Sequence, residues 1–165
     1  MDVLQAGDPA PEIELADDGG TVRRLSEQRG RFVVVVYFYP KDLTSGCTTE
    51  ACSFRDAGAD LAAEGAVVWG ISPQDARSHA RFRAHNALTF PLLVDVEHRV
   101  ADRYGAWVEK TLYGRRYWAT ARMTFLVGPD GRIARIWEKV RPDGHALEVL
   151  AAVRELAGGA PLAPV

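Results

Sequence analysis

The stretch RFVVVVYFY, residues 31–39, constrains the fold of this chain more than any other segment. Every residue after the arginine is β-branched or aromatic, so the segment lacks the apolar–polar alternation of a strand with one face in water. A strand that is apolar on both faces belongs in the middle of a sheet that is covered on both sides. Pro40 ends it, because proline has no backbone N–H to donate to a neighbouring strand. The sequence therefore predicts a layered protein built around one buried strand.

The segments around this strand predict further strands and helices. Before it, EIEL and TVRRL flank the turn sequence DDGG and predict a hairpin. After it, the patterns predict, in order, a helix over 48–63, a strand over 66–72, a helix over 75–86, a strand over 90–95 and a helix over 97–105. Strands over 121–127 and 132–138 flank the turn GPDG, and a helix over 144–159 follows. Within the helix over 75–86, Phe82 is the apolar anchor and Asp75 lies in the first turn.

This order of elements predicts an α/β protein with a thioredoxin-like fold. Its centre would be a mixed β-sheet with helices on both faces, preceded by an N-terminal β-hairpin. The sequence has no repeat, low-complexity block or interior linker. We therefore expect a single domain over residues 1–165, with residues 160–165 as a frayed tail.

Charge and hydropathy argue against two classes of partner. Lys plus Arg is 20 and Asp plus Glu is 22, a balance that gives no electrostatic reason to bind nucleic acid or a membrane surface. The N-terminal stretch lacks the basic and apolar regions of a signal peptide. The longest apolar run is far shorter than the roughly 20 residues of a membrane helix. We expect a cytoplasmic protein with no nucleic-acid or membrane partner.

The two cysteines of the chain, Cys47 and Cys52, are separated by four residues. Two cysteines are too few for a disulfide scaffold, and in a reducing compartment a close pair is typical of catalysis, redox sensing or metal binding. Cys47 lies where a helix should begin after the buried strand. Free backbone N–H groups there stabilise an anion, and thiolates at helix N-termini have lowered pKa values. Gly46 and the polar neighbours favour an open site over a small buried side chain.

The spacing of the cysteines sets a geometric problem. In an ideal helix their Cα atoms would be roughly 8 to 9 Å apart. A disulfide requires a Cα separation below about 7 Å. Either Cys52 takes no part in the chemistry, or the first turns of the helix unwind when the bond forms.

Residues near Cys47 fit an activated thiol but also have ordinary structural explanations. Thr44 is placed to bring a hydroxyl near the sulfur and is equally suited to a turn or helix cap. Termination of the strand explains Pro40, and an N-terminal capping interaction explains Glu50. A thiolate site also requires a cation, and composition alone does not single out one of the 20 basic residues.

The stretch PKDLTSGC matches P-x-x-x-T-x-x-C, the peroxidatic motif of peroxiredoxins. The longer stretch YFYPKDLTSGCTTEACSFRD resembles the bacterioferritin comigratory protein, or peroxiredoxin Q, subfamily. The resemblance covers most of the chain, through GDPAPEIELADDGG, SHARFRAHNALTFPLLVD and YGRRYWATARMTFLVGPDG. The eight-residue motif is specific, and the spacing to the second cysteine is more specific still.

The resemblance implies a thiol-dependent peroxidase of hydrogen peroxide and organic hydroperoxides, with no metal and no bound organic cofactor. Cys47 would become a sulfenic acid, Cys52 would condense with it to a disulfide, and thioredoxin or a similar dithiol would reduce that bond. Thr44 would hydrogen-bond the thiolate and the peroxide, and Pro40 would shield the thiolate from water. Arg122 would stabilise the thiolate and the developing charge; without the resemblance it is an ordinary strand-edge arginine. The subfamily also implies a monomer.

Three positions depart from the pattern of the subfamily. Leu43 stands where a polar residue is commoner, and Ser45 stands where proline is frequent, which loosens the loop entering the helix. Gly128 replaces a usual aspartate outside the motif.

Other functions remain open from the residues alone. A thiol–disulfide oxidoreductase could use the same core, although such enzymes usually carry C-x-x-C and the spacing here is longer. A metal-binding or copper-delivery module would recruit His79, His85, His98 or His145, which are otherwise expected to be surface or capping residues. A redox-dependent chaperone or sensor could use the same thiol.

Overall fold

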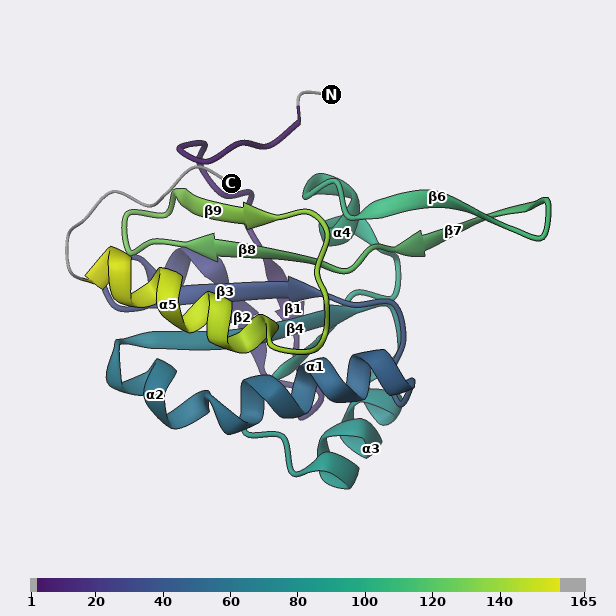
Figure 1. Cartoon of the computed structure of the whole chain (residues 1–165), viewed down its shortest axis with the longest axis horizontal. Helices are drawn as coiled ribbons and strands as arrows, with labels where there is room; N and C mark the ends of the chain where they lie inside the picture. The colour runs from purple at the N-terminus through teal and green to yellow at the C-terminus, as the bar shows by residue number, and fades with distance from the viewer. Residues whose placement is uncertain (1–2, 158–165) are drawn as a thin grey trace.

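The apolar stretch forms the central strand of the sheet in the computed structural model, which describes residues 3–157 (Figure 1). This strand, β3 (Val33–Phe38), is buried at all of its positions. It pairs in parallel with β4 (Ala66–Ser72) and antiparallel with β8 (Met123–Val127). With β5 (Leu92–Val94) and β9 (Ile133–Trp137), the sheet has the order β5-β4-β3-β8-β9. The predicted central place of this strand in a mixed sheet is therefore confirmed.

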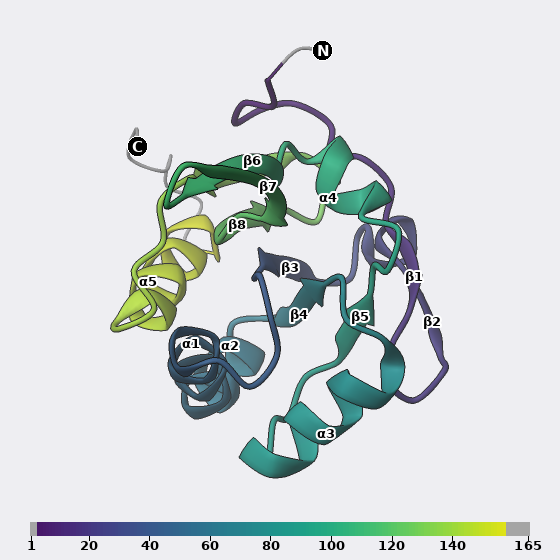
Figure 2. The ribbon, with the colours of Figure 1, turned by 90° about the vertical axis from the view of Figure 1, so that its right-hand side faces the viewer.

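The two faces of β3 pack into two different hydrophobic cores. Because side chains alternate along a strand, Val33, Val35 and Tyr37 enter one core, and Val34, Val36 and Phe38 enter the other. The first core is covered by α1 (Ser45–Asp56), α2 (Gly58–Ala63) and α5 (His145–Ala157). The second is covered by α4 (Arg99–Arg103) and the N-terminal segment. Figure 2 shows these two coverings on opposite sides of the sheet, as expected for the thioredoxin-like α/β fold.

The N-terminal hairpin has the predicted form, with β1 (Glu14–Ala16) antiparallel to β2 (Val22–Arg24). A 3-10 helix, η1 (Leu25–Gln28), leads from it toward β3. The second predicted hairpin, around GPDG, is confirmed as β8 and β9.

A further hairpin was not predicted from the sequence. It consists of β6 (Trp107–Leu112) and β7 (Arg115–Thr120), which pair with each other and project from the body of the molecule (Figure 1). Tyr113 and Gly114 form its two-residue turn, with φ of 52° and 76°. Positive φ at both positions is characteristic of a type I′ hairpin turn. The local signal was present, since Tyr-Gly separates two runs that contain β-branched and aromatic residues.

The helices differ from the prediction mainly at their ends. The predicted helix over 48–63 begins earlier, at Ser45, and is divided at Ala57 into α1 and α2, next to Gly58, a poor helix former. Asp75 is the N-cap of α3 (Ala76–Asn86), not a first-turn residue, and its carboxylate accepts a hydrogen bond of 2.9 Å from the backbone N–H of Ser78. The expected tail over 160–165 lies outside the described residues. Between residues 3 and 157, no helix is long and apolar enough to cross a membrane.

Candidate active site

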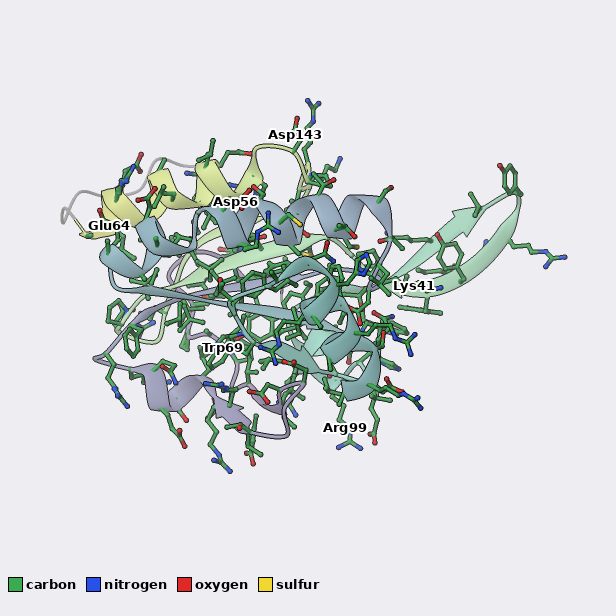
Figure 3. The ribbon with its side chains drawn as sticks, turned by 90° about the horizontal axis from the view of Figure 1, so that it is seen from below. Lys41, Asp56, Glu64, Trp69, Arg99 and Asp143 are labelled. Atoms are coloured by element: carbon green, nitrogen blue, oxygen red, sulfur yellow. The ribbon has the colours of Figure 1, made fainter. Side chains whose placement is uncertain are left out.

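Cys47 lies in the first turn of α1, just beyond the carboxyl end of β3. Thr44 is the N-cap residue, and the first helical hydrogen bond runs from the N–H of Thr48 to its carbonyl at 2.9 Å. The preceding N–H groups therefore have no carbonyl partner within the helix, and they leave partial positive charge beside the sulfur. Figure 3 labels Lys41, just before this helix, and Asp56, its last residue.

The site is less open than the sequence suggested. Cys47 is only 1% exposed, because it packs in the hydrophobic core with Tyr37, Tyr39 and Ala51. The expectation of an open site was therefore wrong. Gly46 and the polar neighbours lie beside a sulfur that is buried in the core.

Arg122 reaches this sulfur from the short connection between β7 and β8. One terminal nitrogen of its guanidinium lies 3.3 Å from the Sγ of Cys47, and the other donates to Oε1 of Glu50 at 2.9 Å. Gly46 makes room for this approach, because a Cβ at that position would lie 3.1 Å from the guanidinium. Arg115 and Arg116, the other arginines of this region, are exposed on β7.

Glu50 is the acidic member of the site and is fully buried one turn after Cys47. Its second oxygen, Oε2, has no hydrogen-bond partner among the described residues. Burial raises the pKa of Glu50 to about 7, although the charge and hydrogen bond of Arg122 act in the opposite direction. Burial also opposes the charge of Arg122, but Glu50 and Cys47 outweigh it and raise the pKa of the guanidinium above its ordinary value. The site therefore holds a permanent cation between a sulfur and a carboxyl group that ionises near neutral pH.

The explanation of Glu50 as a capping residue was wrong, because its carboxyl group accepts a hydrogen bond from the side chain of Arg122, in the connection between β7 and β8. A local signal existed in the sequence. Glu50 follows Cys47 by three positions, so the two side chains share a face of the helix. Only the fold could show that Arg122 contacts both.

Thr44 and Pro40 lie on the loop between β3 and α1, close in sequence to Cys47. The hydroxyl of Thr44 donates to the carbonyl of Lys41 at 2.9 Å, and within residues 3–157 its side chain makes no capping bond to α1. Pro40 follows the last residues of β3, is half-buried, and its carbonyl accepts from the side chain of Gln74 at 3.2 Å. The structure thus brings Arg122 into contact with both Cys47 and Glu50, while the Thr44 hydroxyl is turned toward its own loop.

Cys52 lies on the same helix as Cys47 but outside this buried cluster. It is partly exposed, and its Sγ lies 3.7 Å from Oδ1 of Asn86 at the end of α3. Both thiols are free, and α1 is continuous across them. With the roughly 8 to 9 Å Cα separation of an ideal helix, a disulfide between them requires the helix to open.

Two of the four histidines are buried, which contradicts the expectation of surface or capping residues. His79 lies on the buried side of α3, and His145 lies at the start of α5 with its Nε2 2.8 Å from the hydroxyl of Thr124. Burial, with a contribution from the charge of Arg122, lowers the pKa of His145 to about 4, so this imidazole is neutral. In the part of the chain that the structure describes, no three His, Cys, Asp or Glu side chains are grouped to hold a metal ion.

A buried sulfur at a helix N-terminus, an arginine in contact with it and a second thiol one and a half turns away define a thiol enzyme on a thioredoxin-like scaffold. Comparison with known proteins specifies the class. Residues 6–136 match the AhpC/TSA family. Peroxiredoxin Bcp of Bacillus subtilis is 40% identical over 153 residues, which is 93% of this chain and 97% of that protein. Peroxiredoxin Bcp of Escherichia coli is 38% identical over 94% of this chain and 99% of its own length.

Solved structures agree with these relatives. The bacterioferritin comigratory protein of Xanthomonas campestris, solved in work on its alkyl peroxide reduction activity, superposes with a TM-score of 0.86. The two sequences are 35% identical, and the match covers 94% of this chain and 98% of the other. The chain therefore belongs to the AhpC/TSA family, in the group of Bcp and peroxiredoxin Q proteins, and is a thiol-dependent peroxidase.

Proposed function

We propose that this peroxidase reduces hydrogen peroxide and organic hydroperoxides with Cys47 as the attacking thiolate. The contact between Arg122 and the sulfur, at 3.3 Å, is the observation that carries the assignment. A cation and a helix N-terminus both favour the thiolate over the thiol. The thiolate attacks the terminal oxygen of the peroxide, an S–O bond forms as the O–O bond breaks, and the departing alkoxide or hydroxide takes up a proton. Cys47 is left as a sulfenic acid.

Arg122 has a second role in this step. Negative charge moves from the sulfur to the departing oxygen as the O–O bond breaks, and a fixed guanidinium stabilises it without reorganisation. Thr44 lies at the same helix end, and in this proposal its hydroxyl leaves the carbonyl of Lys41 and rotates to hydrogen-bond the peroxide. Pro40 restricts the access of water from the loop side. The alkyl peroxide reduction studied for the Xanthomonas protein supports organic hydroperoxides as substrates.

Cys52 is the resolving thiol in this proposal. Its sulfur attacks the sulfenic sulfur of Cys47, water leaves, and an intramolecular disulfide forms. Since α1 holds the two thiols apart, its first turns unwind for this step. A dithiol, thioredoxin or one of similar chemistry, then reduces the disulfide by exchange and is itself oxidised.

Peroxide turnover with thioredoxin and thioredoxin reductase tests the assignment, with wild type, Cys47→Ser and Cys52→Ser compared. We expect Cys47→Ser to consume almost no peroxide while keeping a native circular dichroism spectrum. Substantial turnover by that variant would show that another group does the chemistry. Insulin reduction and metal analysis of the same preparations test the thiol–disulfide oxidoreductase and metal-module alternatives.

We further propose that the chain is a single domain that works as a cytoplasmic monomer. The resemblance to the peroxiredoxin Q subfamily supports the monomer. Light scattering coupled to size exclusion, on reduced and on oxidised protein, measures the oligomeric state.

A further inference from the structure

A buried network outside the thiol site joins the loop before α1 to helix α3. Its centre is Asp42, which is 5% exposed and lies between Pro40 and Thr44. The hydroxyl of Tyr39 donates to Oδ1 of Asp42 at 2.6 Å, and the hydroxyl of Ser78 donates to Oδ2 at 2.8 Å. Nδ1 of His79 lies 2.6 Å from the same Oδ2. The side chain of Asp42 is thus held by the end of β3 on one side and by the first turn of α3 on the other.

Both ring nitrogens of His79 lie within hydrogen-bond distance of a buried oxygen. Its Nε2 lies 2.9 Å from the carbonyl oxygen of Leu93, which can only accept, so this nitrogen carries a proton. Burial opposes ionisation of Asp42, but hydrogen bonds from His79, Tyr39 and Ser78 outweigh it and lower the pKa of the carboxyl group. A buried His79–Asp42 pair results, in which loss of the imidazole leaves a buried carboxyl oxygen without one of its hydrogen-bond partners.

The residue next to this pair has a strained backbone. Leu43 has a φ of 64°, in the left-handed region that its Cβ disfavours. Its side chain is 45% exposed, so burial offers little compensation for the strain. Contacts of the neighbouring residue Asp42 therefore stabilise this turn. They are the hydrogen bonds of the Asp42 side chain and the bond of 3.0 Å from the backbone N–H of Asp42 to Oε1 of Gln74. Thr44, the N-cap of α1, follows immediately.

We propose that His79 is a positioning residue for Cys47, acting through Asp42 to hold the strained turn at Leu43, from which α1 begins. The inference rests on the proposed role of Cys47 and adds a group that does not touch the sulfur or the substrate. Within residues 3–157, the side chains that bond Asp42 come from α3 and from the loops that follow β3 and β4, and none comes from α1. The pair therefore stays closed when the first turns of α1 unwind, and it fixes the point from which the helix re-forms after the disulfide is reduced.

The test uses the full-length reduced protein and two rates. One is alkylation of Cys47 by iodoacetamide in the Cys52→Ser background as a function of pH, which does not depend on peroxide chemistry. The other is oxidation by hydrogen peroxide, followed by tryptophan fluorescence. We expect His79→Asn to slow both rates by about tenfold. Without His79, Asp42 no longer holds the left-handed turn at Leu43, and the start of α1 shifts so that Cys47 loses its position next to Arg122. His85→Asn, an exposed change on the same helix, is the matched control and should leave both rates unchanged.

Rescue distinguishes positioning from a general loss of stability. Leu43→Gly removes the strain, since glycine adopts positive φ without a steric penalty. We expect His79→Asn/Leu43→Gly to recover most of the lost rate. Native rates in folded His79→Asn, or slow rates that Leu43→Gly does not improve, would overturn the proposal.

A second variant keeps the test decisive if His79→Asn fails to fold. Ser78→Ala removes one hydrogen bond to Asp42 and leaves the contact between His79 and Asp42 intact, so a smaller slowing is expected, again reversed by Leu43→Gly. No effect of Ser78→Ala would then overturn the proposal. Failure of the proposed function has a different signature: wild type would not turn over peroxide, while the alkylation rate would still respond to His79→Asn.

Discussion

The guanidinium of Arg122 lies 3.3 Å from the Sγ of Cys47, although 75 positions of sequence separate the two residues. The same guanidinium donates to Glu50 at 2.9 Å. The guanidinium therefore interacts with both a sulfur and a carboxyl group. When Glu50 is ionised, its negative charge offsets part of the positive potential that Arg122 creates at the sulfur. Three predictions concern these residues and Cys52, and a fourth concerns the helix that carries both thiols.

Arg122→Met should slow peroxide reduction by about 10²- to 10³-fold, the usual cost of removing one preorganised donor to developing negative charge. It should also raise the pH at which Cys47 reacts with iodoacetamide, because the thiolate loses its nearest cation. Stopped-flow oxidation and alkylation against pH measure the two effects. Arg116→Met, on the exposed face of β7, is the control. Unchanged rates in Arg122→Met would mean that another residue supplies the charge.

Glu50→Gln should change how stability depends on pH. The pKa of Glu50 is raised to about 7 in the folded protein, above its ordinary value of 4.5, so the folded state retains a proton that the unfolded state releases. This contribution is fully present below about pH 4.5 and is lost as pH rises through about 7, by roughly 3 kcal/mol in total. Urea unfolding at pH 5 and pH 8 should therefore show Glu50→Gln gaining stability relative to wild type at the higher pH. A difference that does not vary with pH would contradict the raised pKa.

Cys52→Ser should react once with peroxide and then stop. Without a second thiol, the sulfenic acid on Cys47 persists and is open to further oxidation to sulfinic acid. Mass spectrometry after one equivalent and after excess peroxide distinguishes these products. Cycling with thioredoxin at the wild-type rate would rule out Cys52 as the resolving residue.

Oxidised protein should exchange backbone amide hydrogens faster than reduced protein over residues 45–53. The reason is that a 47–52 disulfide and an intact α1 are geometrically incompatible. Exchange in β3 should be the same in both states, since the strand is buried in the sheet. An oxidised structure with this disulfide inside a regular helix would refute the unwinding.

Local pattern was sufficient to predict the centre of the fold. The unbroken apolar run 32–39 predicted a covered strand, and Pro40 marked its end, so the position of Cys47 at the start of a helix followed. The hairpin β6–β7 was missed because its turn residues, Tyr113 and Gly114, are not the Asn-Gly or Asp-Gly pair that signals such turns most strongly.

The side-chain contacts of the site depend on tertiary structure. The resemblance to peroxiredoxins indicated Arg122, but Glu50 was assigned to a helix cap because its partner lies 72 positions away. His79 was expected at the surface for the same reason: its carboxylate partner is 37 positions distant. Periodicity does not report on such pairs, since it describes only which face of an element is apolar.

The charge environment of Cys47 also bears on how the catalytic cycle closes. In thiol–disulfide exchange, negative charge builds up on the sulfur that leaves, so a nearby cation assists its departure. The helix N-terminus opens when the disulfide forms, but Arg122 lies outside α1, next to the position to which Cys47 returns, whereas Cys52 is the more exposed of the two sulfurs in the reduced protein. We therefore expect a dithiol reductant to attack the sulfur of Cys52 and expel Cys47, so that the mixed disulfide with the reductant forms on Cys52.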